Sequence, residues 1–288
     1  TDIARIFPDV IAHAEQPILR TAPAPLYLLA ELVRHDGLKV VLTGEGADEV
    51  FAGYDIFKES RVRRFCARNP GSRIRPLLFQ RLYPYLPGLQ GQSAEYLATF
   101  FGVDGLRLDD PFFSHWPRFR STAAAKRLFS ADLRASIGGY DAAETMAASL
   151  PERFAKWHPL HQAQYLEARF LLPGGILSAQ GDRMAMAHGV EGRFPYLDHR
   201  VVEFASRLPP EMKLSGLEEK RILRHAGQSL LPPAVAARPK QPYRAPDSEC
   251  FVGNAAPDYV ADTMSARQVA EDGLFNPHAV DSLMSKAR

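Results

Sequence analysis

The sequence predicts a helix-rich α/β fold, and three observations point to it. Residues 39–43 read Lys-Val-Val-Leu-Thr, which is typical of a buried strand. On either side, residues 25–33 and 50–54 carry apolar residues at helical spacing. Beyond residue 54, most segments have helical patterns interrupted by the glycines and the 23 prolines of the chain. A parallel sheet needs several strands and only one is clear here, so we expect the others to precede Thr1.

The predicted elements follow in the order helix, strand, tight turn and helix. The helix over 25–33 ends at residues 35–37, His-Asp-Gly, because glycine favours a helix end. Gly44 and Gly46 allow a tight turn directly after the strand. Farther along, Asp198 is placed to accept a hydrogen bond at the start of another helix.

Composition excludes several classes of protein. With 288 residues and 46% hydrophobic side chains, the chain can bury a sizeable core, so general disorder is excluded. Its 35 Lys and Arg against 33 Asp and Glu give no general reason to expect a nucleic-acid or membrane partner. Cys66 and Cys250 are too few for a disulfide framework. Two cysteines are also usual for a reducing compartment, so we expect a cytoplasmic protein. No apolar run approaches the roughly 20 residues of a membrane span.

The turn after the strand combines glycines with three carboxylates. Gly44 and Gly46 permit close approach of the backbone, while Glu45, Asp48 and Glu49 crowd the start of the following helix. A bare phosphate site would carry Lys or Ser, so acids here favour a cation between protein and phosphate. Mg²⁺ is usually held by one or two carboxylates together with phosphate oxygens. The alternative is that these acids only favour the positive end of the helix dipole.

Two further segments are candidates for the site. Residues 238–246 place three cations, Arg238, Lys240 and Arg244, on a proline-rich loop that suits a polyanion. A plain exposed surface loop is the alternative. Residues 165–198 contain Glu167 on a predicted helix and an Asp-Arg pair at 182–183, which alone is more typical of a structural ion pair than of catalysis.

Together, these segments resemble the C-terminal synthetase domain of the glutamine-dependent asparagine synthetases. Residues 41–54 are similar to the acidic motif of that family, residues 182–199 to its second signature and residues 238–241 to its third. The three motifs occur in the family's order over most of the chain. The resemblance implies part of an adenine-nucleotide alpha-hydrolase-like, Rossmann-like domain with a large helical portion. The segment from 57 to 156 is matched by position only and is expected to be a helical region inside it.

The resemblance also implies a reaction. The family activates the side chain of aspartate with Mg-ATP as β-aspartyl-AMP and releases pyrophosphate. Ammonia from glutamine then attacks, which gives asparagine and AMP. The expected substrates are therefore aspartate and ammonia or glutamine, with ATP and Mg²⁺ as cofactors.

By the same resemblance, six residues receive expected roles. Thr43 and Gly44 match nucleotide contacts, and Asp48 matches the acid that binds magnesium. Glu45 matches the acid needed around ammonia attack, Lys240 the cation at the α-phosphate, and Glu167 a further acidic position. The related β-lactam synthetases carry tyrosine where Glu45 stands, so Glu45 favours amide formation between two molecules over ring closure.

Two departures from the family lead us to expect a fragment. The chain has no Ser-Gly-Gly-x-Asp-Ser loop, which the family uses for ATP phosphates, and it begins with Thr1 instead of the glutaminase nucleophile cysteine. We expect residues 1–288 to be the C-terminal part of a synthetase domain, inactive in isolation. An exposed strand left at the sheet edge could pair with a second copy, so a homodimer is also expected.

Two other functions stay open at this point. A member of the same family could amidate another carboxylate, in a peptide, a sugar acid or a natural product. Residues 58–81 also form a basic stretch with interleaved phenylalanines, which is the footprint of a nucleic-acid-binding module. A solvated helical face is the simpler interpretation of that stretch, given the near-neutral chain. The histidines show no metal-ligand spacing.

Overall fold

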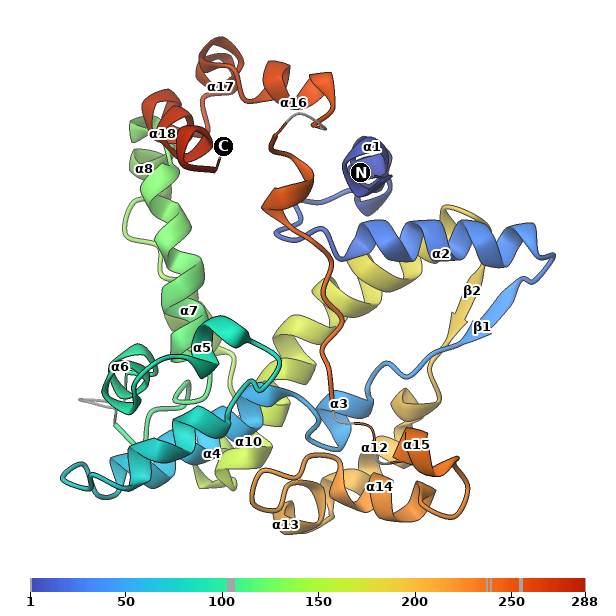
Figure 1. The fold of residues 1–288 in the computed structure, drawn as a ribbon, viewed down its shortest axis with the longest axis vertical. Coiled ribbons are helices and arrows are strands. Elements are labelled where there is room, and N and C mark those ends of the chain that lie inside the picture. Colours follow the sequence, from blue (N-terminus) through green and yellow to red (C-terminus); the bar gives the residue numbers. More distant parts are fainter. Residues whose placement is uncertain (1, 103–106, 237, 239, 254–255, 288) are drawn as a thin grey trace.

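The computed structural model describes residues 2–102, 107–236, 238, 240–253 and 256–287, and in these residues a small parallel sheet lies beside many helices (Figure 1). Strand β1 (Val40–Leu42) pairs with β2 (Glu191–Arg193), with Val41 opposite Gly192. A strand within 39–43 is thus confirmed, and so is the helix-rich α/β class. The expected burial of the strand is wrong, since Val40 and Leu42 are 45% and 78% exposed in a described sheet of two strands. The partner strand β2 was not predicted. Thr1, with which the predicted fragment boundary begins, lies outside the described residues.

The first two helices of the chain pack together beside the small sheet (Figure 1). Helix α1 (Asp2–Ala14) and helix α2 (Pro23–His35) pack against the short α11 (Arg183–Met186) around the fully buried Val10 and Met184. The prediction of a helix over 25–33 is confirmed, and Gly37 follows it in the left-handed conformation. Helix α2 therefore leads directly into β1.

The helix expected at 50–54 is displaced toward the N-terminus. Helix α3 is a single turn, Ala47–Val50, and α4 (Asp55–Ala67) begins separately. Ala52, with φ of 60°, interrupts the helical path, and the amide of Gly53 donates to the Asp48 carbonyl at 2.8 Å. Two helices in different directions thus follow the turn in place of one.

The described residues of the middle segment, 57–156, form mainly short helices, and residues 103–106 lie outside the described part. That this segment is a helical region inside a synthetase domain stays a prediction. The short 3₁₀ segment η1 (Arg75–Arg81) and α6 (Ala94–Phe100) pack with α4 around Phe79, Leu97 and Phe101. A second apolar cluster gathers around Phe112, Phe154 and Leu166. The elements of this region are α5 (Pro87–Gln90), α6 (Ala94–Phe100), α7 (Trp116–Ala123), η2 (Ala124–Leu128), α8 (Ala131–Ile137), α9 (Ala142–Ala148) and η3 (Phe154–Lys156).

A long helical rod crosses the centre of the molecule (Figure 1). It starts as α10 (Pro159–Leu166), continues as the π-helical segment η4 (Glu167–Asp182) and ends in α11. The chain then forms β2, the short η5 (Pro195–Leu197) and α12 (His199–Ser206). Asp198 caps α12 by accepting from the Arg200 amide at 2.9 Å, which confirms that prediction.

The remaining segment returns past the acidic turn at residues 44–49 and ends beside the middle region. Helices α13 (Pro210–Lys213), α14 (Arg221–Gly227) and α15 (Pro233–Ala236) lie below the turn in Figure 1. Thr21 binds Asp247 and the Pro246 carbonyl, which fixes the chain beyond residue 240. Its last elements are η6 (Ser248–Cys250), α16 (Asp258–Thr263), α17 (Ala266–Asp272) and α18 (Pro277–Ala287). None of the helices described here is long and apolar enough to cross a membrane.

Candidate active site

The candidate site begins at the carboxyl end of β1. The Thr43 amide continues the sheet by donating to the Arg193 carbonyl at 3.0 Å, while its buried hydroxyl Oγ1 has no hydrogen-bond partner within the described structure. Gly44 is exposed, and a Cβ added there would meet nothing within 4 Å. The end of the strand therefore offers an unused hydroxyl beside open space, which suits a ligand that approaches the backbone closely.

Gly46 joins the acidic turn to the second signature. Its φ of 89° lies in the left-handed region, and an added Cβ would lie 2.3 Å from Leu197 Cδ2 and 2.7 Å from Leu197 Cγ. Glycine is needed at this position both for backbone conformation and for close packing. The acidic turn at residues 44–49 thus packs directly against residues 195–197, which lie about 150 positions later in the sequence.

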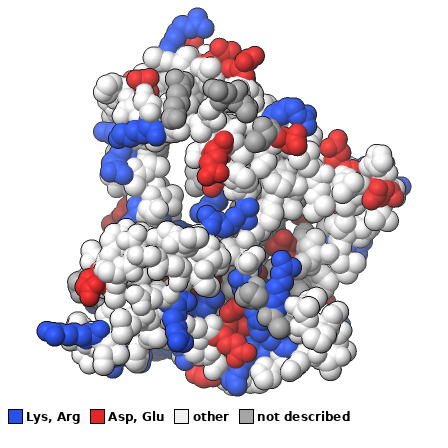
Figure 2. Space-filling model, viewed as in Figure 1, with Lys and Arg blue, Asp and Glu red and all other residues white. Residues whose placement is uncertain are grey.

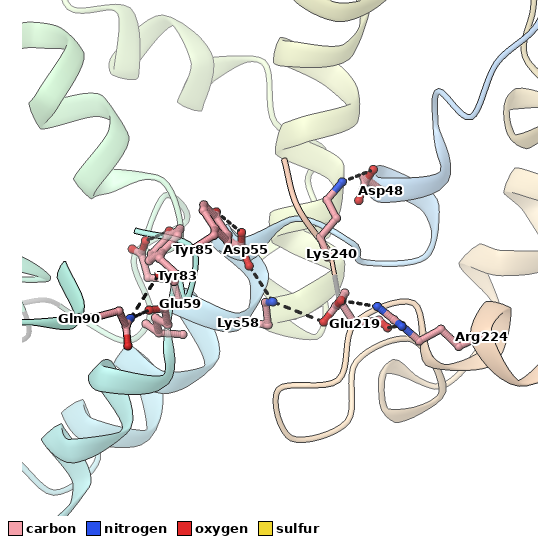
Figure 3. A network of polar contacts seen from close by, with 11 residues as sticks. Asp48, Asp55, Lys58, Glu59, Tyr83, Tyr85, Gln90, Glu219, Arg224 and Lys240 are labelled. Carbon is pink, nitrogen blue, oxygen red and sulfur yellow. Dashed lines mark hydrogen bonds and ion pairs between the residues drawn. The ribbon is translucent and has the colours of Figure 1, made fainter. Parts of the chain in front are cut away.

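Asp48 lies between two lysines. Its Oδ2 is 3.0 Å from Lys240 Nζ, and its Oδ1 is 3.0 Å from Lys220 Nζ; Figure 3 shows the Lys240 contact. Gly53 makes room for this group, since a Cβ there would lie 2.0 Å from Asp48 Oδ1 and 2.1 Å from Lys220 Cε. The structure therefore brings Asp48 and Lys240 together. Sequence reasoning missed Lys220, whose only signal was a cation just before a helical pattern.

Glu45 lies close enough to Asp48, Lys220 and Lys240 for their charges to affect the pKa of its carboxyl. Burial raises the pKa of its carboxyl, the charge of Asp48 raises it further, and Lys240 and Lys220 oppose the shift. A carboxylate with a raised pKa can take up a proton nearer to neutral pH than an ordinary one. Glu45, Asp48 and the two lysines thus form a mixed-charge cluster, the kind of arrangement found where anions are bound and protons move.

Glu49 faces away from this cluster. It is 2% exposed and accepts a hydrogen bond of 2.7 Å from the Tyr54 hydroxyl. The Gln164 amide fastens the same short helix by donating to the Glu49 and Val50 carbonyls at 2.5 and 2.9 Å. Of the three acids in the turn, Glu49 therefore makes a structural contact and Asp48 pairs with both lysines, whereas the lysines act on Glu45 through their charge.

Glu167 lies outside the lysine cluster in a buried group of its own. Its Oε1 is 2.6 Å from Arg118 Nη1 and 3.1 Å from His115 Nε2, and its side chain is fully buried. Burial raises the pKa of this carboxyl, but the His115 hydrogen bond and the Arg118 charge outweigh burial and lower it overall. The structure thus shows a structural ion pair at Glu167 and leaves its predicted catalytic role untested.

A chain of polar contacts places the loop of Lys240 (Figure 3). Lys58 on α4 contacts Asp55 at 2.7 Å and Glu219 at 3.4 Å, and Glu219 contacts Arg224 at 2.7 Å. Arg224 also donates to the backbone carbonyls of Ala236 and Arg238 at 3.4 and 3.3 Å. The segment from Glu219 to Lys240 is therefore fastened to α4 at one end and to the acidic turn at the other.

Several cations of the basic stretch at 58–81 are used inside the fold. Arg63 is fully buried and donates to the Phe101 and Phe113 carbonyls, and Lys58 is ion-paired. Arg75 stacks on Phe65. The stretch is thus not simply a solvated face, as its composition suggested. Figure 2 shows both signs of charge interspersed over the face in view. That the chain binds no nucleic acid stays a prediction, as do the homodimer and the cytoplasmic location.

The donor chemistry fits magnesium bound together with phosphate. Among the described residues, no three His, Cys, Asp or Glu side chains gather around a possible metal position. Asp48, with Glu45 beside it, offers the one or two carboxylates that Mg²⁺ usually takes from protein when phosphate oxygens complete its shell. Lys220 and Lys240 add the positive charge that phosphate oxygens need.

These features define a class of site: a turn at the carboxyl end of a parallel strand, as in α/β domains that bind phosphorylated ligands. The chain belongs to the asparagine synthase family, since the model of that family, described as "Asparagine synthase", matches residues 1–288. The domain is accordingly of the adenine-nucleotide alpha-hydrolase type.

Curated relatives support the same family. The chain is 31% identical to the amidase chyE of Penicillium rubens, over 99% of this chain and 44% of that protein. It is 28% identical to the amidase chry2 of Gibberella zeae, over 98% of this chain and 43% of that protein. It is also 28% identical to asparagine synthetase (glutamine-hydrolyzing) 1 of Bacillus subtilis, over 83% of this chain and 35% of that protein. The chain spans less than half the length of these relatives.

Proposed function

We propose that this chain forms the amide-forming site of an ATP-dependent ligase, in which a carboxylate is adenylated and then attacked by ammonia. The observation that carries the proposal is the placement of Asp48 between Lys220 and Lys240 at the end of β1. When bound, Mg-ATP supplies the activation of the carboxylate and pyrophosphate as leaving group. Glutamine is the proposed source of ammonia, by the family resemblance.

Different residues of the site are proposed to bind the metal ion, the phosphates and the nucleotide. Asp48 would hold the magnesium ion. Lys240 and Lys220 neutralise negative charge that grows at the phosphate and on the leaving group, a contribution that is large in water-poor sites. The unpartnered Thr43 hydroxyl and the open backbone at Gly44 position the nucleotide.

Glu45 is proposed to accept the proton that ammonia loses when it attacks the adenylated carboxylate. Its raised pKa suits a carboxylate that accepts a proton from the attacking nitrogen, at either carboxylate oxygen. Glu167 is proposed to act through position, because its ion pair with Arg118 and its hydrogen bond with His115 fix the start of η4 behind the acidic turn. Aspartate is the first acceptor to test, with asparagine as product.

A second candidate is amidation of a different carboxylate. The two relatives named amidases align with 99% and 98% of this chain, whereas the Bacillus subtilis asparagine synthetase aligns with 83%. This wider match favours an acceptor other than aspartate, such as a peptide or natural-product carboxylate.

The test is carboxylate-dependent release of pyrophosphate by the intact polypeptide that carries this chain. Mg-ATP and ammonium are supplied with aspartate or with a panel of other carboxylates, and amide products are identified by mass spectrometry. We expect release to require an acceptor and to fall about 100-fold, the order of a lost charge-stabilising group, in Lys240→Met and Lys220→Met. Lys126→Met, at an exposed lysine on η2, is the matched control. Acceptor-independent formation of ADP and phosphate would contradict the proposal.

A further inference from the structure

A cavity lies beside α3, and its lining within the described residues includes Glu49 and Val50 but not Asp48, Lys220 or Lys240. It has a volume of about 410 Å³, within the range of small-molecule pockets. Helix α3 packs there against α10, η4 and α12 (Figure 1), and α13 supplies one further wall. Its apolar lining includes Trp157 and Tyr165, whose rings meet edge to face at 5.4 Å between centroids, together with Val50 and Val202.

The floor of this cavity holds a lysine without a counter-ion. Lys213 is 2% exposed, and in the described part of the chain its ammonium makes no ion pair and no hydrogen bond. Burial alone lowers the pKa of this lysine to about 8. The buried carboxylate of Glu49 also lines the cavity, but it accepts from the Tyr54 hydroxyl and makes no ion pair with Lys213. An unpaired buried ammonium is costly, and an anion bound beside Lys213 would offset that cost.

Besides Glu49, two buried acceptors that lack a partner in the described structure line the same space. Gln164 donates through its amide nitrogen to α3, which leaves its buried Oε1 without a partner in the described structure. His161 interacts with the Leu208 backbone, while its buried Nε2 also lacks a partner there. Burial and the neighbouring Lys213 lower the pKa of His161 to about 4, so its free nitrogen is an acceptor at neutral pH. Both groups call for a donor that the described protein does not provide.

The cavity opens to solvent at one side. Ala168, Val202 and Ser206 are exposed and lie at this mouth, whereas Lys213 and Gln164 lie at the buried floor. The hydroxyl of Ser206 is already used, since it donates to the Glu203 carbonyl at 2.8 Å. A ligand could thus enter past small side chains and present its charged end to the lysine.

We propose that this cavity binds a small aromatic or branched aliphatic carboxylate that also carries a hydroxyl or amino hydrogen. The carboxylate pairs with Lys213, the hydrogen-bearing group donates to Gln164 or His161, and the apolar body packs on Trp157 and Tyr165. This binding site is separate from the lysine cluster around Asp48 and needs no ATP. A ligand that contacts Gln164 is also linked to the acidic turn, because the Gln164 amide donates to two backbone carbonyls of α3.

The experiment is calorimetric titration of the intact polypeptide, without nucleotide, with three probes. Mandelate has both polar groups, phenylacetate lacks the hydroxyl, and benzyl alcohol lacks the charge. We expect saturable binding of mandelate, binding of phenylacetate several-fold weaker, and no measurable binding of benzyl alcohol. Absence of saturable mandelate binding up to about 10 mM, roughly tenfold above a millimolar dissociation constant, would overturn the proposal.

Variants assign the binding to this cavity. Lys213→Met keeps the length of the side chain without the charge and is expected to weaken mandelate binding at least tenfold, whereas Lys126→Met leaves it unchanged. Ala168→Trp closes the mouth from an exposed position and is expected to abolish binding with the lysine still present, which keeps the test valid if Lys213→Met fails to fold. Unchanged affinity in Ala168→Trp would place the binding elsewhere and overturn the proposal.

Discussion

Replacing Gly53 by alanine should disable the site without changing any of its charged residues. The new Cβ would lie 2.0 Å from Asp48 Oδ1 and 2.1 Å from Lys220 Cε, whereas Cβ atoms essentially never approach other heavy atoms within 3.0 Å. One or both side chains must therefore move by about 1 Å. A misplacement of about 1 Å in a catalytic arrangement can cost about 100-fold in rate. The ion pair itself is partly solvated, so the free energy of unfolding should change by only about 1 kcal/mol or less.

The assay for Gly53→Ala is acceptor-dependent pyrophosphate release, with thermal unfolding recorded on the same samples. Gly139→Ala is the matched control, because a Cβ at that position meets nothing within 4 Å. We expect the control to retain the wild-type rate and the Gly53 variant to lose about two orders of magnitude. A wild-type rate in Gly53→Ala would refute the reasoning that the spacing of Asp48 and Lys220 matters. A rate loss that follows a large drop in melting temperature would refute it as well, since misfolding would then explain the loss.

Three further predictions follow from single contacts. Gly46→Ala should lower the free energy of unfolding by about 2 kcal/mol, from left-handed strain and the clash with Leu197, as read from urea midpoints; an unchanged midpoint would contradict it. If Glu45 is the base, activity should fall as pH drops through its raised pKa, and this acidic limb should be absent from the residual activity of Glu45→Gln. An acidic limb that persists in Glu45→Gln would exclude Glu45 as that base. Glu167→Gln should lower the free energy of unfolding by about 2 kcal/mol at neutral pH, as read from urea midpoints. Because the pKa of Glu167 is lowered in the folded state, this difference should vanish as pH falls through that pKa.

The local elements around the turn were predictable because their signals are local. The strand is an uninterrupted apolar run followed by glycines, and Asp198 precedes its helix in the position of a cap. The contact of Asp48 with Lys240 joins residues 192 positions apart, and only the order of the three motifs pointed to it. The catalytic assignments themselves stay predictions.

Other features depend on contacts between residues far apart in the sequence, which local patterns do not predict. Strand β2 is Glu-Gly-Arg, without β-branched residues, and is a strand only because β1 lies beside it. Lys220 stands in a Glu-Glu-Lys-Arg run that is typical of a solvated surface, yet its side chain is 21% exposed and ion-paired. The shortened helix after the turn reflects the left-handed backbone at Ala52, a residue type that gives no warning of it.

The position of Asp48 between two lysines has a thermodynamic consequence for ligand binding. A free lysine side chain carries about 2 kcal/mol of rotamer entropy, which it loses when it is fixed in one geometry. Because Asp48 already orders Lys220 and Lys240, most of this entropy is lost during folding and not when an anion binds. An incoming polyphosphate thus meets two ammonium groups already arranged about one point, and the acid acts as their template until the phosphate oxygens replace it.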